Sequence, residues 1–126
     1  MKFYTRRAVK PTDLNPSNVL FGGALLSWID EEVAIFAGCQ MKTQTIVTKY
    51  MSEINFTSSA KSGDVIEFGV EVVKVGRTSM TLACLVRNKM THESIIKVDR
   101  IVFVAIGEDG RPVAHGAELN EMAVSS

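Results

Sequence analysis

The chain has 126 residues, of which 46% are apolar and 22% are charged. This length and composition predict one globular domain over residues 1–126, with a single hydrophobic core. The 14 lysines and arginines balance the 14 aspartates and glutamates, so no net charge attracts nucleic acid or an anionic membrane, and we expect neither as a partner. No apolar run resembles a signal peptide or a membrane span, which predicts a soluble, cytoplasmic protein.

The two segments nearest the N-terminus predict a short strand and a long helix. Residues 2–9 mix polar and apolar side chains, as edge strands do. Gly22 and Gly23 open a helical run that we expect to end at Gly38, because glycine readily adopts the left-handed conformation that terminates helices. Apolar residues cover most of the circumference of this helix, so its surroundings must be apolar along most of its length.

The rest of the chain predicts four further strands. Residues 44–56 alternate with a period of two and are rich in β-branched and aromatic side chains, which predicts one long strand. Residues 65–75 and 80–86 flank the short segment VGRTS and predict a hairpin. Residues 94–106 end in an apolar run typical of a central strand. Consecutive strands without a helix between them pair antiparallel, so we expect an α+β domain whose sheet wraps the helix.

One face of the predicted helix carries a carboxylate among small side chains. Spacings of four, three, four and three residues place five positions on this face. A buried carboxylate without a partner costs several kcal/mol, roughly, unless water or a ligand reaches it. Asp30 is therefore either a functional group or a side chain that reaches solvent, a lysine or an arginine, and the second alternative is favoured for Glu31 and Glu32. The five positions are Gly23, Ser27, Asp30, Ala34 and Ala37.

The start of the same helix offers unpaired backbone N–H groups and a partial positive charge, and glycine lets a ligand atom approach them. An oxyanion fits there, and an oxyanion site with a general base is the minimum for hydrolysing an acyl bond. Gly22 and Asp30 are eight residues apart, about 12 Å along one helix axis. One chain cannot bring both to one carbon atom, but two antiparallel copies of the helix related by a two-fold axis can. Hydrolysis therefore requires a homodimer.

Three blocks in order resemble one enzyme family: PTDLNPSNVLFGGALLSWIDEE, SEINFTSSAKSGD and VGRTS. The chain is similar, from about Arg6 to the EDGRP turn, to the hotdog-fold acyl-CoA thioesterases, in particular the YciA-type and broad acyl-CoA hydrolases. The resemblance implies a hotdog fold in which a long central helix is wrapped by a five-stranded antiparallel sheet. It also implies an acyl-CoA substrate, active sites at a homodimer interface, and dimers that assemble into tetramers or hexamers.

The resemblance implies roles for individual residues. Asp30 matches the general base or nucleophile, Gly22 matches the backbone N–H that polarises the thioester carbonyl, and Asn15 falls where relatives keep an amide side chain. The VGRTS turn matches the segment against the phosphopantetheine and nucleotide of CoA, where Arg77 suits a phosphate. No metal or cofactor is implied, because CoA is part of the substrate. The residues expected to contact substrate are Gly23, Ser58, Ser59, Lys61, Gly76, Arg77, Thr78 and Ser79.

Two departures from the family and several alternatives complete the expectations. Many relatives have histidine at Phe21, although YciA-type members also carry phenylalanine, and some place a hydroxyl side chain at Ala34 to hold the water. A hotdog dehydratase would need a histidine ahead of the helix, whereas His92 and His115 lie downstream, where we expect surface positions. The alternative in another functional class is a non-catalytic acyl-CoA-binding or sensing protein on the same fold.

The remaining expectations concern apolar and sulfur-containing side chains. Cys39 and Cys84 have apolar neighbours, and two cysteines cannot define a disulfide framework or a four-ligand zinc site, so we expect reduced core residues. Nothing places either cysteine near a histidine as a nucleophile. Trp28, Met51 and Phe56 are the candidates for the floor of an acyl tunnel.

Overall fold

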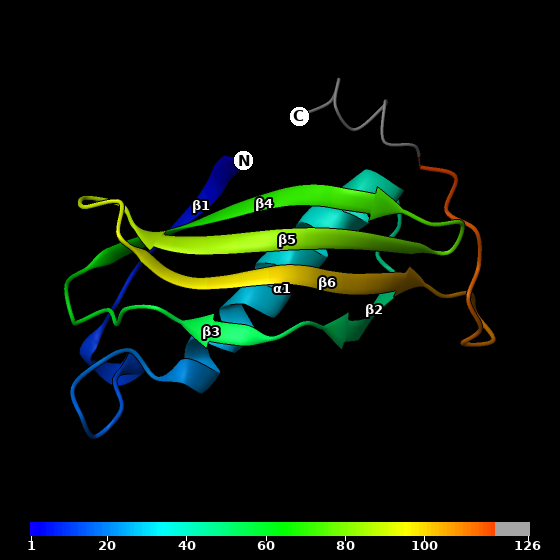
Figure 1. Ribbon diagram of the computed structural model, residues 1–126. Helices are drawn as coiled ribbons and strands as arrows, with labels where there is room; N and C mark the ends of the chain where they lie inside the picture. Colours follow the sequence, from blue (N-terminus) through cyan, green and yellow to red (C-terminus); the bar gives the residue numbers. More distant parts are fainter. Residues whose placement is uncertain (118–126) are drawn as a thin grey trace.

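The computed structural model describes residues 1–117. One long helix crosses a curved antiparallel sheet on its concave side (Figure 1). The elements are β1 (Lys2–Ala8), the 3-10 turn η1 (Pro11–Asp13), α1 (Gly22–Met41), β2 (Ile46–Met51), β3 (Ile54–Phe56), β4 (Val65–Val75), β5 (Ser79–Asn88) and β6 (Ser94–Ala105). The expected α+β architecture is confirmed.

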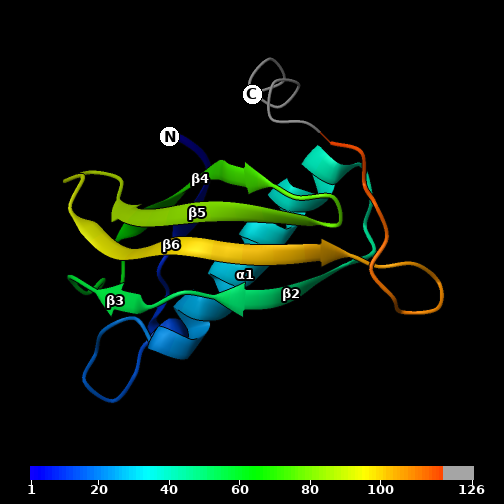
Figure 2. The same ribbon diagram turned by 45° about the vertical axis from the view of Figure 1, so that its right-hand side comes forward.

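The strands follow the order β1-β4-β5-β6-β2, and the short β3 also pairs with β6. Every pairing is antiparallel. β1 forms one edge of the sheet, as expected, and β2 and β3 follow one another along the other edge, as the turned view in Figure 2 also shows. β6 lies between β5 and these two strands, which confirms its expected central place.

The single long strand expected over residues 44–56 is wrong in detail, because it is divided into β2 and β3. Ser52 lies at the division. Its backbone N–H donates to the Arg100 carbonyl at 2.8 Å, while its hydroxyl oxygen accepts from the Arg100 N–H at 3.0 Å. A side-chain oxygen thus takes a position that a backbone carbonyl takes in a regular ladder. The sheet has six strands in place of five, although the order of neighbours is that of a five-strand path.

The helix continues past Gly38, contrary to expectation, and ends at Met41. Lys42 adopts the left-handed conformation, with φ of 57°, and caps the helix by donating its backbone N–H to the Gly38 carbonyl. Gly38 serves close packing instead. A Cβ atom there would lie 2.8 Å from the Thr43 carbonyl oxygen, so only glycine lets the chain fold back over the last turn.

The hydrophobic core lies between α1 and the concave face of the sheet. Leu25, Ile29 and Val33 are fully buried on the helix, and the inward side chains of β4, β5 and β6 pack against them. Trp28 is also buried, and the Arg7 guanidinium on β1 lies 4.1 Å from the centre of its ring system. Among the described residues, no helix is long and apolar enough to cross a bilayer.

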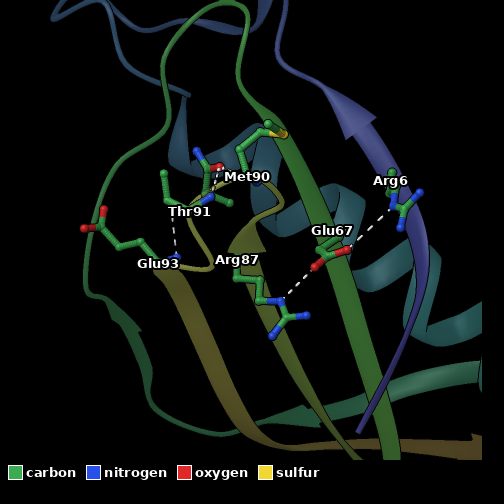
Figure 3. Close-up of polar contacts among 7 residues, drawn as sticks. Arg6, Glu67, Arg87, Met90, Thr91 and Glu93 are labelled. Carbon is green, nitrogen blue, oxygen red and sulfur yellow. Dashed lines mark hydrogen bonds and ion pairs between the residues drawn. The ribbon is translucent and has the colours of Figure 1, made fainter.

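A buried carboxylate lies on the other face of the sheet. Glu67 on β4 is 4% exposed and lies between two arginines of neighbouring strands (Figure 3). Arg87 Nε donates to one carboxylate oxygen at 2.8 Å, and Arg6 Nε is 3.6 Å from the other. Burial opposes ionisation of Glu67, but the hydrogen bond and charge of Arg87 and the charge of Arg6 outweigh it and hold its pKa below the ordinary 4.5.

We predict that Glu67→Gln lowers the free energy of unfolding by about 1–2 kcal/mol, because it weakens the charge-assisted hydrogen bond with Arg87 and leaves two solvent-accessible arginines beside an uncharged group. The exposed Glu71→Gln on the same strand is the matched control and should have little effect.

The pH dependence of stability gives a second test. Folding lowers the pKa of Glu67, so the ionised carboxylate stabilises the wild type above the pKa that Glu67 has in the unfolded chain. This contribution disappears as the pH falls through the pKa of Glu67 in the folded protein. Urea denaturation at pH 7 and near pH 3 measures the effect of the substitution and the effect of pH. Equal stability of Glu67→Gln and Glu71→Gln at pH 7 would contradict the stabilising role of Glu67.

Candidate functional site

A pocket of about 280 Å³ lies at the N-terminal end of α1, and we call it the glycine pocket. Four residues expected at the site, from three separate segments, meet there: Asn15, Gly22, Ser58 and Ser59. Phe56 also lines it, so of the three candidates for a tunnel floor it is the one at this pocket. The other lining residues are Val19, Leu20, Leu25, Ala60 and Ile95.

The first amides of α1 are available to a ligand. The N-cap residue is Phe21, which has no side-chain oxygen to accept from them. The first backbone bond at this end runs from the Leu25 N–H to the Phe21 carbonyl, and the amides of Gly22 and Gly23 have no acceptor within residues 1–117. The Phe56 ring packs against Gly22, 3.3 Å from the position that a Cβ atom would take. Glycine thus keeps the amide accessible beside an aromatic wall.

Asn15 is held in one orientation by its own loop. Its side-chain oxygen accepts from the backbone N–H groups of Ser17 at 2.9 Å and Val19 at 3.3 Å. The loop closes through the bond from the Asn15 N–H to the Val19 carbonyl, with Asn18 in the left-handed conformation. The side-chain NH₂ group has no acceptor within residues 1–117. Asn15 therefore adds a second hydrogen-bond donor to the wall of the glycine pocket.

Asp30 is half-buried on α1 and has one recorded polar partner, Thr48 on β2. The Thr48 hydroxyl donates to Asp30 Oδ1 at 2.7 Å. No lysine or arginine of the described residues pairs with this carboxylate, so the ion-pair alternative is excluded within them. Asp30 does not line the glycine pocket of its own chain. The structure thus fixes one carboxylate oxygen, and the other has no partner within residues 1–117.

The helix face that carries Asp30 among small residues is exposed at its N-terminal end and buried at its C-terminal end. All five positions lie on one helix, as expected: Gly23 and Ser27 are exposed, Asp30 and Ala34 are half-buried, and Ala37 is fully buried. A groove of about 630 Å³ follows this part of α1 towards β2. It is lined by Ala34, Ile35, Gly38, Cys39, Lys42, Thr43, Gln44 and Ile46.

The VGRTS turn lies far from the glycine pocket in the same chain. Ser58 donates its hydroxyl to the Ser94 carbonyl at the start of β6, whereas Thr78 accepts from the Ala105 N–H at its end. The 12 residues of β6 separate these contacts by roughly 35 Å at about 3.3 Å per residue. Figure 1 shows the connection of β4 and β5 near the C-terminal end of α1. The chain does not bring the two groups of expected substrate contacts together.

Within the turn, Gly76 donates its N–H to the Ser79 carbonyl at 2.9 Å. A Cβ atom on Gly76 would lie 2.5 Å from the Ser79 hydroxyl oxygen, a side-chain atom that can rotate away. Arg77 is exposed and has no ion-pair partner within residues 1–117. Lys61 is exposed as well, and its backbone N–H donates to the Asp64 carboxylate, so it stands outside the glycine pocket.

Comparison with known proteins places this arrangement in a family. Residues 17–95 match the family model described as the thioesterase superfamily. The chain belongs to the thioesterase superfamily. The resemblance inferred from the three sequence blocks is thereby confirmed, and with it the hotdog fold, since solved thioesterases share the architecture described above.

Three members of this superfamily illustrate the similarity. The uncharacterized acyl-CoA thioester hydrolase ZMO0511 of Zymomonas mobilis is 32% identical over 105 residues, covering 81% of this chain and 70% of that protein. HI0827, a hexameric broad specificity acyl-coenzyme A thioesterase, superposes with a TM-score of 0.81 at 25% identity, over 98% of this chain and 86% of that one. An acyl-CoA hydrolase of Staphylococcus aureus, solved with butyryl coenzyme A and coenzyme A, gives a TM-score of 0.78 at 30% identity, over 87% and 66%. The chain spans about two thirds of the Zymomonas and Staphylococcus proteins.

Several other expectations need correction in this thioesterase-superfamily chain. Glu32 is half-buried and accepts from the Thr5 hydroxyl on β1 at 2.7 Å, whereas we expected it to reach solvent or a cation. Cys39 is exposed on α1 rather than buried, and only Cys84 lies in the core; both are free. Burial, with the charge of Glu32, raises the pKa of Cys84 to about 12, so it is no nucleophile. His92 is exposed, as expected.

His115 is also different from its expected surface position, because it is half-buried against the VGRTS turn. No group of three or more potential metal ligands lies together within residues 1–117.

Sequence reasoning missed Thr48 altogether. A signal was present, because Thr48 falls on the same side of its strand as Ile46 and Tyr50, where a hydroxyl among apolar neighbours marks a polar contact with the helix.

Proposed function

We propose that this protein is an acyl-CoA thioesterase whose smallest active unit is a homodimer. The names of its relatives support the substrate class, since those proteins are described as acyl-CoA thioester hydrolases and one was solved with butyryl coenzyme A. Hexameric thioesterases among the similar structures support an assembly built from such dimers.

The observation that carries the proposal is the state of Asp30. Its carboxylate lies on a helix that is otherwise largely apolar, has no cation partner in the described chain, and receives one hydrogen bond from Thr48. That bond orients the group and leaves Oδ2 for chemistry. Glu67, in contrast, is buried and paired with two arginines, whereas the half-buried Asp30 stays accessible to water or a ligand.

Hydrolysis of the thioester then needs few groups. Asp30 either accepts the proton of a water molecule as that water attacks the carbonyl carbon, or attacks this carbon itself and forms an anhydride that water cleaves. In both cases the carbonyl oxygen becomes an oxyanion, and the Gly22 N–H with the Asn15 side-chain amide of the other chain stabilises it. The carbon–sulfur bond breaks and CoA leaves as its thiolate. The reaction needs no resident cofactor or metal.

A second chain is needed because α1 separates Asp30 from the Gly22 amide by about 12 Å. The surface on this side of the molecule is suited to such a contact. Large apolar side chains of α1, β2 and β3 are about half exposed around the glycine pocket and the groove, and β2 and β3 form a free edge of the sheet. They are Phe21, Ile35, Val47, Tyr50 and Phe56.

The CoA portion would bind across the same interface. In one chain the VGRTS turn is at the opposite end of β6 from the glycine pocket, so antiparallel helices would carry the turn of one chain towards the pocket of the other. Arg77 offers a guanidinium without a partner in the described chain, suited to a phosphate. Ser58, Ser59 and Lys61 are weaker contacts, since the Ser58 hydroxyl already donates to Ser94.

Substituted positions in a relative agree in spacing with Asp30 and Asn15. Solved structures of the Staphylococcus aureus acyl-CoA hydrolase include forms in which an aspartate, an asparagine or a threonine is replaced by alanine. The aspartate and asparagine are separated by the same number of positions as Asp30 and Asn15. The threonine follows the aspartate by one position fewer than Thr48 follows Asp30.

We further propose a cytoplasmic location, because both cysteines are free.

Asp30→Asn is expected to lower kcat for butyryl-CoA hydrolysis by about 10²–10⁴, the usual contribution of a placed base. Thr48→Val, which removes the orienting bond but keeps the side-chain volume, should cost about tenfold. Glu31→Gln, exposed on the next position of α1, is the control and should leave the rate unchanged. Release of free CoA thiol measures all three. Binding of acyl-CoA without thiol release by the wild type would contradict the proposal and favour the acyl-CoA sensor.

Gly22→Pro tests the amide donor directly. Gly22 is the first residue of α1, and Phe21 before it is already extended, so proline fits the backbone there while removing one N–H group. We expect about a 10²–10³-fold loss of kcat, as for other oxyanion donors. Gly22→Ala also crowds Phe56 but keeps the amide, so it is the matched control and should lose far less. Equal losses in both variants would show that crowding, and not the donor, is responsible.

A further inference from the structure

The VGRTS turn is held from one side by the segment that follows β6. The His115 backbone N–H donates to the Arg77 carbonyl at 3.2 Å, and the ring nitrogen Nε2 lies 2.8 Å from the Ser79 carbonyl oxygen. The Ala117 N–H donates to Nδ1 at 3.0 Å, so Nδ1 is the acceptor and Nε2 carries the hydrogen that Ser79 receives. Both ring nitrogens are therefore engaged. Figure 1 shows this segment, in orange and red, beside the connection of β4 and β5.

The backbone acceptors and donors of the VGRTS turn differ in how they are satisfied. All three carbonyl oxygens from Arg77 to Ser79 accept hydrogen bonds: the first from His115, the second from Ala105, and the third from Gly76 and the His115 ring. The backbone N–H groups of Arg77 and Thr78 have no acceptor within residues 1–117. The carbonyl oxygens of the turn are thus hydrogen-bonded within the protein. The two N–H groups and the Arg77 guanidinium remain available to bind an anion.

We infer that His115 is a positioning residue that fixes the donors of the VGRTS turn for the phosphate-bearing end of CoA. This inference rests on the proposed function and adds to it a determinant of substrate recognition. His115 touches no residue of the glycine pocket and no neighbour of Asp30 by hydrogen bond, and its contacts lie at the opposite end of β6. It therefore acts on the nucleotide portion of the substrate and leaves the thioester chemistry alone.

A purely structural role for His115 makes a different prediction. Loss of a structural bond lowers stability and affects every substrate alike. Loss of a positioning bond weakens the binding only of those substrates that contact the VGRTS turn. Butyryl-CoA carries the nucleotide and its phosphates, whereas butyryl-pantetheine carries the same thioester without them, so this pair of substrates separates the two roles.

The experiment compares three variants with the wild type on both thioesters, by thiol release. His115→Phe keeps a ring but removes both nitrogens, and His115→Gln restores an N–H donor near the position of Nε2. His92→Phe is the matched control, because His92 is the other histidine and is exposed. We expect His115→Phe to raise KM for butyryl-CoA about three- to tenfold, the value of one hydrogen bond. Its kcat and its kinetics with butyryl-pantetheine should be unchanged, and His115→Gln should recover most of the loss.

The inference is overturned if His115→Phe leaves KM for butyryl-CoA unchanged, or if it impairs both thioesters equally. Arg77→Ala, measured in parallel, should raise KM for butyryl-CoA alone; no effect there removes the turn from CoA binding and overturns the inference as well. Failure of the proposed function looks different, since the wild type would then release thiol from neither substrate. If His115→Phe folds only in part, the ratio of its KM values for the two thioesters still tests the inference, because KM does not depend on the amount of folded enzyme.

Discussion

The arrangement of this protein depends on the length of one helix. α1 fills the concave face of the sheet, and its apolar contacts with β4, β5 and β6 fix it against the core. The same rigid rod sets Asp30 about two turns beyond the free amide of Gly22, a separation of about 12 Å that no side-chain rotation removes. Within one chain, Asp30 and the Gly22 amide are therefore too far apart to act on the same carbon atom. In the proposed homodimer, two antiparallel copies of α1 would bring them together in two equivalent sites.

Two carboxylates of the helix, Asp30 and Glu32, have similar hydrogen bonds but different surroundings. Asp30 and Glu32 each accept a hydrogen bond from a threonine at opposite edges of the sheet, Thr48 on β2 and Thr5 on β1. Glu32 lies near the buried Cys84, whose pKa is raised, and borders the small pocket between α1 and β1. Asp30 lies on the side of the free edge formed by β2, where exposed apolar side chains are suited to a second chain. Similar local chemistry thus serves packing on one side and supplies the proposed base on the other.

Much of the fold follows from periodicity in the sequence, and the failures have local causes. Alternation with a period of two predicted strands over residues 44–56 and 65–75, because burial on the concave face selects every second residue. The other three strand positions were predicted from turns, composition and apolar runs, and the strand over 44–56 is divided in the structure. The break at Ser52 was not visible, since it depends on a side-chain bond to Arg100, a residue of another strand. The helix end was misplaced because Gly38 is needed for the close approach of Thr43, and Lys42 takes the left-handed conformation instead. For the site, spacing on one helix selected Asp30 and Gly22 as candidates, but it could not select Thr48 and His115, whose hydrogen-bond partners are 18 and 36 residues away in sequence.

The central claim is that each active site combines Asp30 of one chain with the Gly22 amide of another. Mixing Asp30→Ala and Gly22→Pro chains under conditions where subunits exchange tests it most directly, because each mixed dimer then holds one intact site and one doubly defective site. The account predicts that two inactive proteins together regain about a quarter of wild-type thioesterase activity at random exchange. Formation of mixed dimers, verified by native mass spectrometry, without any gain in activity would contradict it.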